Sequence, residues 1–224
     1  MPKDLFSAEG FAQVCIIDYG LGNITSVYNA IKTLGFNVNI SNNHSDIEKA
    51  THLILPGVGS FYSGMKNLQE YDLIDILNHE VIKKKKPILG ICLGMQLLLD
   101  ESDEFGLTKG LGLIPGRVVA IPSKNNEGII NKIPHIGWSK LINPEENSDW
   151  NEEILKTVES GDSFYFIHSY MALTNNNKHT IAHCLYGSEK IPAVIQHNRI
   201  IGCQFHPEKS GEVGLKILRE FCEF

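Results

Sequence analysis

A cysteine flanked by two glycines is the first candidate for chemistry, in segment 90–94 (Gly-Ile-Cys-Leu-Gly). The segment follows the apolar run 87–91 and leads into the helix-like run 95–99. A sharp turn from a buried strand into a helix needs small residues beside a nucleophile, because the backbone is strained there. A helix N-terminus favours a thiolate and leaves backbone amides free for an oxyanion. Most free cysteines are inert packing, but this context predicts a nucleophile at Cys92.

A thiol with a pKa of about 8.5 needs a base, and pairing with histidine lowers that pKa strongly. Nine histidines are available, most of them in polar segments where a solvated or structural role is the default. His206-Pro207-Glu208 instead follows the apolar run 201–205, so it lies at the end of a strand, where active sites of α/β proteins collect. In extended chain Glu208 points the same way as His206 and could orient and polarise it.

Three glycine-rich turns could approach a ligand closely. Pro56-Gly57-Val58-Gly59 ends another apolar run, and its glycines allow close approach to a substrate or a change of conformation. The turns around Gly20 and at 110–112 lack the dinucleotide-binding fingerprint and its helix context. We therefore expect no nucleotide cofactor at either.

The first half of the chain alternates apolar strand-like runs with amphipathic segments. Strands are predicted at 14–17, around 38–40, at 52–55 and at 87–91, and helices at 27–34, around 65–68 and around 73–77. The last of these strands is too apolar to face water. Such alternation predicts a parallel sheet with helices on both faces.

Beyond Gly110 the pattern becomes rich in short β-like runs, at 116–121, 164–167, 180–185, 193–196 and 200–205, before an amphipathic C-terminal helix over 215–222. The predicted fold is α/β, with an open, mostly parallel central sheet flanked by helices and a β-rich second half. Residues 1–12 are expected to form an N-terminal extension and 13–224 one domain, with a polar loop at 143–151.

Composition excludes several classes of function. The net charge of −6 gives no basic surface for nucleic acid, and the run Lys83–Lys86 is expected in a solvated loop or helix end. Five scattered cysteines without CxxC spacing indicate neither a disulfide framework nor a zinc site, so a reducing cytoplasm fits best. No apolar run reaches the roughly twenty residues of a membrane helix, and the N-terminus lacks the apolar core of a secretory signal.

Together these motifs carry a family resemblance. The order PGVG, GICLGMQ, HSY and QFHPEKSG resembles the class I (triad) glutamine amidotransferases, and the resemblance extends from segment 16–23 to segment 202–211. Segments 134–138 (PHIGW) and 165–170 (YFIHSY) are similar to the branch that contains the glutaminase subunit of imidazole glycerol phosphate synthase.

The resemblance assigns roles by position. It implies that Cys92 attacks the carboxamide of glutamine, that His206 acts as base and then as acid, and that Glu208 orients His206. The oxyanion site maps to the backbone amide of Leu93, with a second donor near Val58. The positions that hold the amino-acid end of glutamine are Gly59, Gln96, Ser169 and Tyr170.

The resemblance also implies a partner, and no cofactor is expected. Free ammonia becomes ammonium and diffuses away, so hydrolysis is useful only when gated and channelled, and the chain has no obvious acceptor-substrate domain. A cyclase or synthase subunit of the (β/α)8-barrel type, forming a heterodimer and receiving ammonia, is expected. Trp138 lies in the region that faces this partner in the family, although it could equally be a core aromatic.

Two departures from the family pattern leave the acceptor pathway open. Ser139 stands where Asn is expected, and the N-terminal extension is unusual. Histidine biosynthesis is the first hypothesis, and amidination of a bacterial surface sugar by a paralogous system is the second. A freestanding cysteine hydrolase and a scaffold that has lost catalysis are further alternatives, of which the intact Cys92, His206 and Glu208 argue against the last.

Overall fold

The structure is a computed structural model that describes residues 12–124, 128, 130–144, 150, 153–159, 161–187 and 189–224. The predicted extension at 1–12 therefore lies, except for Ala12, outside the described residues, as does most of the predicted loop at 143–151. The helices are α1 (Ile24–Thr33), α2 (His44–Lys49), α3 (Phe61–Glu70), α4 (Ile74–Asn78), the π-helix η1 (His79–Lys83), α5 (Leu93–Leu97) and α6 (Gly211–Cys222), with the 3-10 turns η2 (Glu153–Leu155), η3 (Asn177–His179) and η4 (Pro207–Lys209).

A central seven-stranded sheet has the order β11-β12-β13-β4-β3-β1-β2. Its strands are β1 (Gln13–Ile17), β2 (Asn37–Ser41), β3 (His52–Gly57), β4 (Ile88–Cys92), β11 (Thr180–Tyr186), β12 (Glu189–His197) and β13 (Ile200–Cys203). The pairs from β2 through β1, β3 and β4 to β13 are parallel, whereas β12 and β11 are antiparallel additions. The predicted mostly parallel sheet is confirmed.

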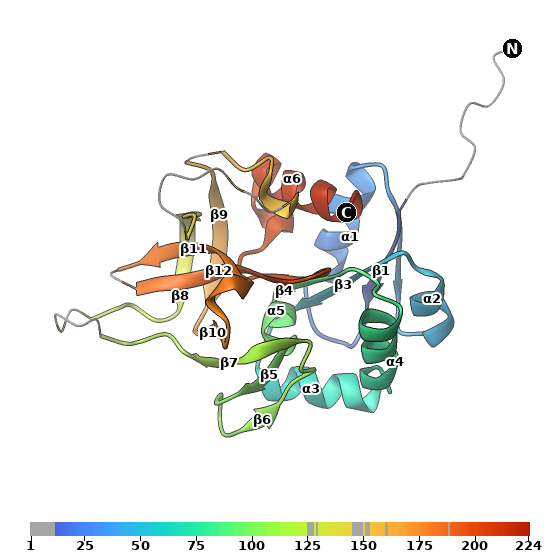
Figure 1. Cartoon of the computed structure of the whole chain (residues 1–224), viewed down its shortest axis with the longest axis horizontal. Helices are drawn as coiled ribbons and strands as arrows, with labels where there is room; N and C mark the ends of the chain where they lie inside the picture. The colour runs from blue at the N-terminus through green and yellow to red at the C-terminus, as the bar shows by residue number, and fades with distance from the viewer. Residues whose placement is uncertain are drawn as a thin grey trace, which may run out of the picture.

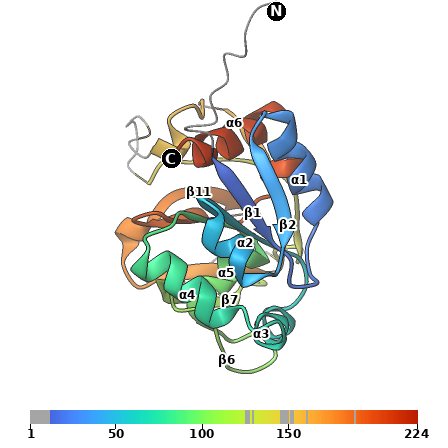
Figure 2. The same ribbon diagram turned by 90° about the vertical axis from the view of Figure 1, so that its right-hand side faces the viewer.

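The central strands β3, β4 and β13 are buried along their whole length, which explains why they are almost wholly apolar, whereas the edge strand β2 is largely polar and exposed. Along β1, Val14 and Ile16 belong to one core, and Cys15 and Ile17 to the other. Helices α1 and α6 supply Ile31 and other side chains to the first core, whereas α3, α4 and α5 supply the second. Figures 1 and 2 show α1 and α6 on one side of the sheet and α2, α3 and α4 on the other.

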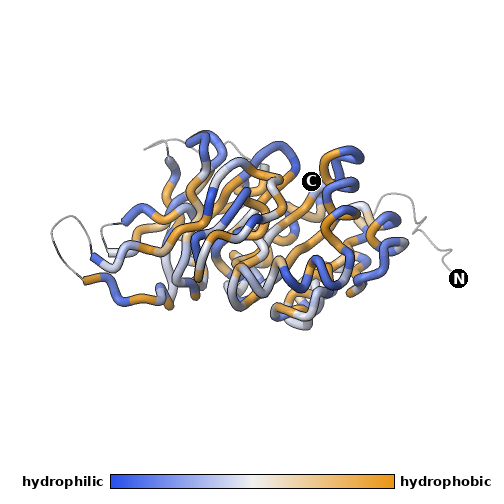
Figure 3. Tube along the Cα trace, turned by 90° about the horizontal axis from the view of Figure 1, so that it is seen from below, coloured by the Kyte–Doolittle hydropathy of each residue, from blue (hydrophilic) through white to orange (hydrophobic). Residues whose placement is uncertain are grey.

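Two smaller sheets complete the strand-rich second half. One has the order β10-β7-β5-β6, and the other is an antiparallel ribbon of β8 and β9. Their strands are β5 (Leu99–Ser102), β6 (Thr108–Lys109), β7 (Ile114–Ala120), β8 (His135–Lys140), β9 (Ser163–His168) and β10 (Tyr170–Thr174). Buried and more exposed positions alternate along β7 and β9, as expected for strands with one face on a core. The tube in Figure 3 changes repeatedly between apolar and polar along the chain.

The predicted helix over 95–99 is wrong in its extent, because α5 ends at Leu97 and Leu99 begins β5. The carbonyl of Leu98 accepts hydrogen bonds from the backbone amides of Leu113 and Ile114. In a continuing helix this carbonyl would instead accept from an amide of the next helical turn. Three consecutive leucines show neither the helical nor the strand spacing of apolar residues, so the sequence does not mark where α5 ends. Elements α2, β5, β6, β8 and β10 were not predicted from the sequence.

The lysine run is only partly solvated. Lys83, Lys84 and Lys85 are exposed, but Lys86 is 9% exposed and its ammonium lies 2.6 Å from a carboxylate oxygen of Glu80. Lys86 also donates to the carbonyls of Ile47 and Glu48 at 2.6 and 3.0 Å. The expectation that the whole run is solvated is therefore wrong for its last member, which ties the start of β4 to α2.

Candidate active site

Cys92 lies on a strained turn between β4 and α5. Its backbone φ is 54° and ψ is −107°, a conformation that residues other than glycine rarely adopt. A Cβ at Gly94 would lie 1.7 Å from the carbonyl oxygen of Leu55, and one at Gly90 would lie 2.6 Å from the backbone of Gly94 and Met95. Close packing therefore requires glycine at both flanking positions. This is the sharp strand-to-helix turn that the sequence predicted at Cys92.

The end of β3 lies directly beside the nucleophile. Gly57 is in register with Cys92, and Val58 and Gly59 follow at the edge of the sheet. The hydroxyl of Tyr19, fully buried, donates to the carbonyl of Pro56 at 2.7 Å and fixes this strand end. A side chain at Gly57 would collide with that hydroxyl. The backbone of Val58, the predicted second oxyanion donor, therefore follows directly after the residue paired with Cys92.

His206 and Glu208 form a buried pair. Nδ1 of His206 lies 2.8 Å from Oε1 of Glu208, and the two side chains are 2% and 1% exposed. The turn η4 that carries Glu208 is tied to β9, because the His206 amide donates to the Tyr165 carbonyl and Ser210 bridges the Tyr165 amide and the His206 carbonyl. The carboxylate thus fixes the ring so that Nε2 carries its reactive lone pair or proton.

Burial lowers the pKa of His206, but the nearby Cys92 sulfur and the hydrogen-bonded Glu208 carboxylate outweigh it and raise that pKa to about 9, while Nε2 of His206 makes no hydrogen bond of its own. Since the histidine interacts with both neighbours, Cys92, His206 and Glu208 form one electrostatic unit. An imidazolium next to the sulfur favours the nucleophilic thiolate. The arrangement can therefore support acyl transfer through a thioester.

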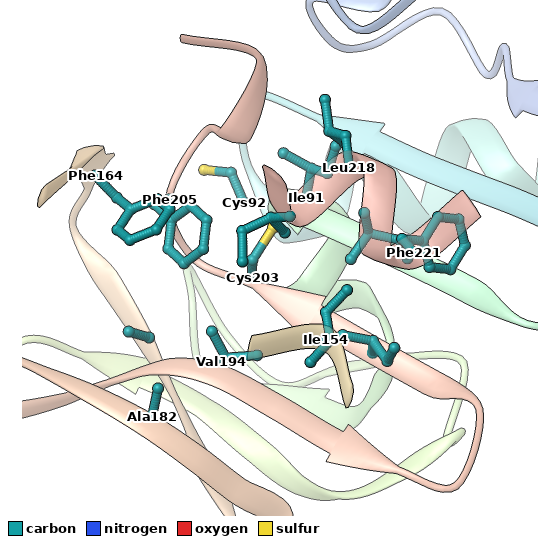
Figure 4. Packing of buried hydrophobic residues seen from close by; sticks show 14 of the residues in the cluster. Ile91, Cys92, Ile154, Phe164, Ala182, Val194, Cys203, Phe205, Leu218 and Phe221 are labelled. Atoms are coloured by element: carbon teal, nitrogen blue, oxygen red, sulfur yellow. The ribbon is translucent and has the colours of Figure 1, made fainter. Parts of the chain in front are cut away.

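A cavity of about 300 Å³ opens above Cys92. Seven of the residues predicted to contact substrate or oxyanion line it, namely Val58, Gly59, Cys92, Leu93, Gln96, Ser169 and Tyr170. His206 and Glu208 are buried and do not line the cavity. Figure 4 shows Cys92 between Phe205 and Ile91 in this view, among the labelled residues of the first apolar core.

Four further residues line the cavity without having been anticipated as site residues: Glu104, Pro134, Ile167 and His168. The carboxylate of Glu104 accepts a hydrogen bond from the Phe61 amide at 2.6 Å and is the acidic group of the cavity wall. It follows several other acidic residues at 100–103, so nothing in the sequence singles it out. Trp138 is 58% exposed and lies outside the cavity, so the alternative of a core aromatic is wrong.

His168 and His135 form a buried pair beside the cavity. Nδ1 of His168 lies 2.8 Å from the Tyr170 carbonyl, which can only accept, so this nitrogen carries the proton. Nε2 of His168 must then accept from Nδ1 of His135 at 3.0 Å, and Nε2 of His135 must accept from the Ser139 hydroxyl at 3.0 Å. Burial lowers the pKa of His135 to about 4 and that of His168 to about 3, and both rings are neutral.

We expect this pair to make the protein sensitive to acid. Their folded pKa values lie below the ordinary value of 6.5, so the stability that they contribute is present above pH 6.5 and lost as pH falls towards 4. Each site contributes up to about 1.4 kcal/mol per pH unit in that window. The free energy of unfolding of His135→Asn, measured between pH 7 and 4.5 by urea denaturation, should fall less steeply than that of the unchanged chain. An identical slope would contradict neutral burial of His135.

Among the described residues, no group of three or more acidic, histidine or cysteine side chains has the geometry to hold a metal ion. In the same part of the chain, no helix is long and apolar enough to cross a membrane.

The fold and the site are those expected of a cysteine-dependent hydrolase or acyl transferase, with the candidate nucleophile Cys92 on a strand-to-helix turn and the His206–Glu208 pair behind it. The family model "Glutamine amidotransferase class-I" matches residues 15–223. The chain therefore belongs to the class I glutamine amidotransferase family, as the motifs predicted.

Curated relatives extend over nearly the whole chain. Imidazole glycerol phosphate synthase subunit HisH 1 of Legionella pneumophila (strain Lens) is 46% identical over 212 residues, covering 95% of this chain and 99% of that one. The HisH subunit of Geobacillus sp. (strain WCH70) is 45% identical, covering 92% of this chain and 94% of that one. These relatives are named as subunits, so the proteins that this chain resembles act with a partner.

Solved structures agree on the fold. The crystal structure of a glutamine amidotransferase has a TM-score of 0.68 at 19% identity, over 94% of this chain and 97% of that one. PurLQS from Thermotoga maritima has a TM-score of 0.62 at 20% identity, over 95% of this chain and 98% of that one. Identity this low supports the architecture alone.

Proposed function

We propose that this chain is the glutaminase subunit of an imidazole glycerol phosphate synthase, which hydrolyses L-glutamine to glutamate and passes the ammonia to a cyclase subunit in the cytoplasm. The single observation that carries the chemistry is Cys92 on its strained turn, facing the cavity, with the buried His206–Glu208 pair beside it. The near-full-length relation to HisH subunits supports the pathway.

In the proposed mechanism the thiolate of Cys92 attacks the carboxamide carbon of glutamine. The oxyanion that forms accepts hydrogen bonds from the backbone amide of Leu93, at the start of α5, and from the end of β3 near Val58. His206 protonates the departing nitrogen, so ammonia leaves and a thioester remains. His206 then removes a proton from water, which attacks the thioester and releases glutamate and the thiol.

The cavity wall offers complementary groups for the amino-acid end of glutamine. Both N–H groups of Gln96 are taken, by the Tyr170 carbonyl and by Gln204, each at 3.0 Å. A ligand can therefore meet only the carbonyl oxygen of Gln96, which suits an ammonium. The Glu104 carboxylate adds negative charge on the same wall. Gly59, Ser169 and Tyr170 complete the proposed substrate site, with Ser169 and Tyr170 offering donors for the carboxylate.

The proposed partner surface lies at the mouth of this cavity, on the outer face of the β8–β9 ribbon. Ile136 and Ile167 face each other across the ribbon and are 55% and 39% exposed, and the rings of Trp138 and Tyr165 meet edge to face. An apolar patch beside an open active site indicates a surface that a partner covers. A (β/α)8-barrel cyclase, forming a heterodimer there, would close the cavity and keep ammonia from water.

Two alternatives stand beside this function, one with the same chemistry and one of a different class. The paralogous system that amidinates a bacterial surface sugar would use the same Cys92 turn with another acceptor, and Ser139 in place of the expected Asn is the residue that favours it. A freestanding cysteine hydrolase would be active without any partner.

The test of the pathway is stimulation by a partner. We expect slow hydrolysis of glutamine by the purified chain alone and a rise of about a hundredfold or more with the cyclase and its nucleotide substrate, because positioning an oxyanion donor contributes about 10² to 10³ in turnover. Production of glutamate, followed with a coupled dehydrogenase, measures it. No stimulation by a competent cyclase would favour the sugar pathway, and full activity without a partner would favour the freestanding hydrolase.

A further inference from the structure

The Cys92 sulfur accepts a hydrogen bond that neither the motifs nor the family relation assigns. Nε2 of Gln204 lies 3.7 Å from Sγ of Cys92, a normal distance for a hydrogen bond to sulfur. Gln204 is fully buried in the segment between β13 and His206, and it does not line the cavity. A buried amide has few places to satisfy its groups, so its orientation is decided by its neighbours.

One backbone carbonyl decides that orientation. The Tyr170 carbonyl can only accept, so the group of Gln96 that lies 3.0 Å away must be its NH₂. The same NH₂ lies 3.0 Å from Gln204, which must therefore present Oε1 to Gln96. The remaining group of Gln204, its own NH₂, is left to point at Sγ. An amide flip at Gln204 would set two donors against each other and leave a carbonyl oxygen facing a thiolate.

The Tyr170 carbonyl is itself held in place from the other side. Nδ1 of His168 donates to it at 2.8 Å, and His168 is in turn held by His135. The Tyr170 carbonyl thus accepts from two buried side chains, His168 and Gln96. Gln96 is the one that also contacts Gln204. In the folded chain the direction of each hydrogen bond from Tyr170 through Gln96 to Gln204 is consequently fixed.

We propose that Gln204 is a further catalytic residue, whose side-chain amide donates to Sγ of Cys92 and stabilises the thiolate, and that Gln96 is the positioning residue that holds this amide the right way round. A hydrogen bond from a neutral donor to an anion is stronger than one to a neutral sulfur, so it favours the ionised form before substrate binds. The inference deepens the proposed function, but it concerns the thiol alone and requires neither the partner nor glutamine.

The pH dependence of Cys92 alkylation tests the proposal. In the full-length Gln204→Met variant, which keeps the length of the side chain, we expect the pH of half-maximal alkylation by iodoacetamide to rise by about one unit, the low end for one hydrogen bond to a charged group. Modification of Cys92 is followed by peptide mass spectrometry, which separates it from the four other buried cysteines. Each alkylation rate is divided by the rate of the same variant at high pH, so a change in the accessibility of Cys92 does not alter the midpoint.

Gln96→Met provides the second measurement and the control for packing. Without its orienting partner the Gln204 amide can flip, so the midpoint should rise by a smaller amount, about 0.3 units if half of the molecules present the wrong group. Added to Gln204→Met, the same change should have no further effect. The proposal is overturned if folded Gln204→Met keeps the original midpoint, or, should that variant not fold, if Gln96→Met keeps it.

Discussion

Replacing Cys92 by serine is expected to abolish glutamine-dependent turnover, with a loss of about 10⁴-fold or more, while the partner synthase still works on added ammonium salts. The thiol is the group that forms the proposed thioester, and a hydroxyl at the same place is not ionised by a histidine in the way that a thiol is. Removing the nucleophile of a catalytic unit removes most of what the unit contributes. Glutamate release and synthase turnover, measured in parallel with glutamine and with ammonium chloride, separate the two steps.

The matched control is Cys222→Ser, which makes the same chemical change at a buried cysteine of α6 that belongs to the apolar core and not to the cavity. It should alter stability and leave glutamine turnover within about twofold, since it touches no reacting atom. If Cys92→Ser also lost the ammonium-dependent reaction, the division of labour between the subunits would be wrong.

Replacing His206 by asparagine should lower glutaminase turnover by about 10⁴-fold, since it removes both the proton carrier and the charge that favours the thiolate. The two losses have separate signatures. Loss of the imidazolium moves the midpoint of Cys92 alkylation to higher pH, because the histidine whose pKa is held near 9 no longer stands beside the sulfur. Loss of the acid for the leaving nitrogen slows release of ammonia even at a pH where Cys92 is fully ionised. Stopped-flow measurement of ammonia release, set against the alkylation profile, distinguishes them.

His79→Asn is the control for this change, because His79 is exposed on η1 and takes no part in the cavity. Its turnover should equal that of the unchanged chain. Wild-type activity in a folded His206→Asn variant would remove His206 from the mechanism and leave the thiol to be activated by other groups, such as Gln204.

The local motifs predicted the central features of this site because each feature depends on residues that are close together in the sequence. Gly90 and Gly94 flank Cys92 because a Cβ at either would strike the neighbouring backbone, and that requirement is visible in the sequence as two glycines around a cysteine. His206 and Glu208 are two residues apart, so their side chains could be expected to meet without knowledge of the rest of the fold. The apolar runs likewise predicted the parallel strands, since a strand buried on both faces has no polar positions.

Other features depended on contacts between segments far apart in the chain. The end of α5 is set by residues 111–114, which take the carbonyls that a longer helix would need. Lys86 is buried because Glu80 and the end of α2 surround it, although its neighbours in the lysine run are exposed. Glu104 follows β5 and His168 ends β9. No local pattern distinguishes Glu104 from the acidic residues before it, and the HSY motif that contains His168 did not assign this histidine to the cavity.

By itself the sequence determined the family, the glycine-flanked turn at Cys92 and the contact between His206 and Glu208, because glycines, strand ends and two-residue spacing are encoded within a few positions. Only the tertiary structure decided how the cavity is walled and how its polar groups are oriented. Gln204 is separated from Cys92 by 112 positions, and its donor faces the sulfur only because the Tyr170 carbonyl orients Gln96. Which group of an amide donates and which accepts depends on all of its neighbours together. These neighbours meet only when β4, β10 and β13 are assembled.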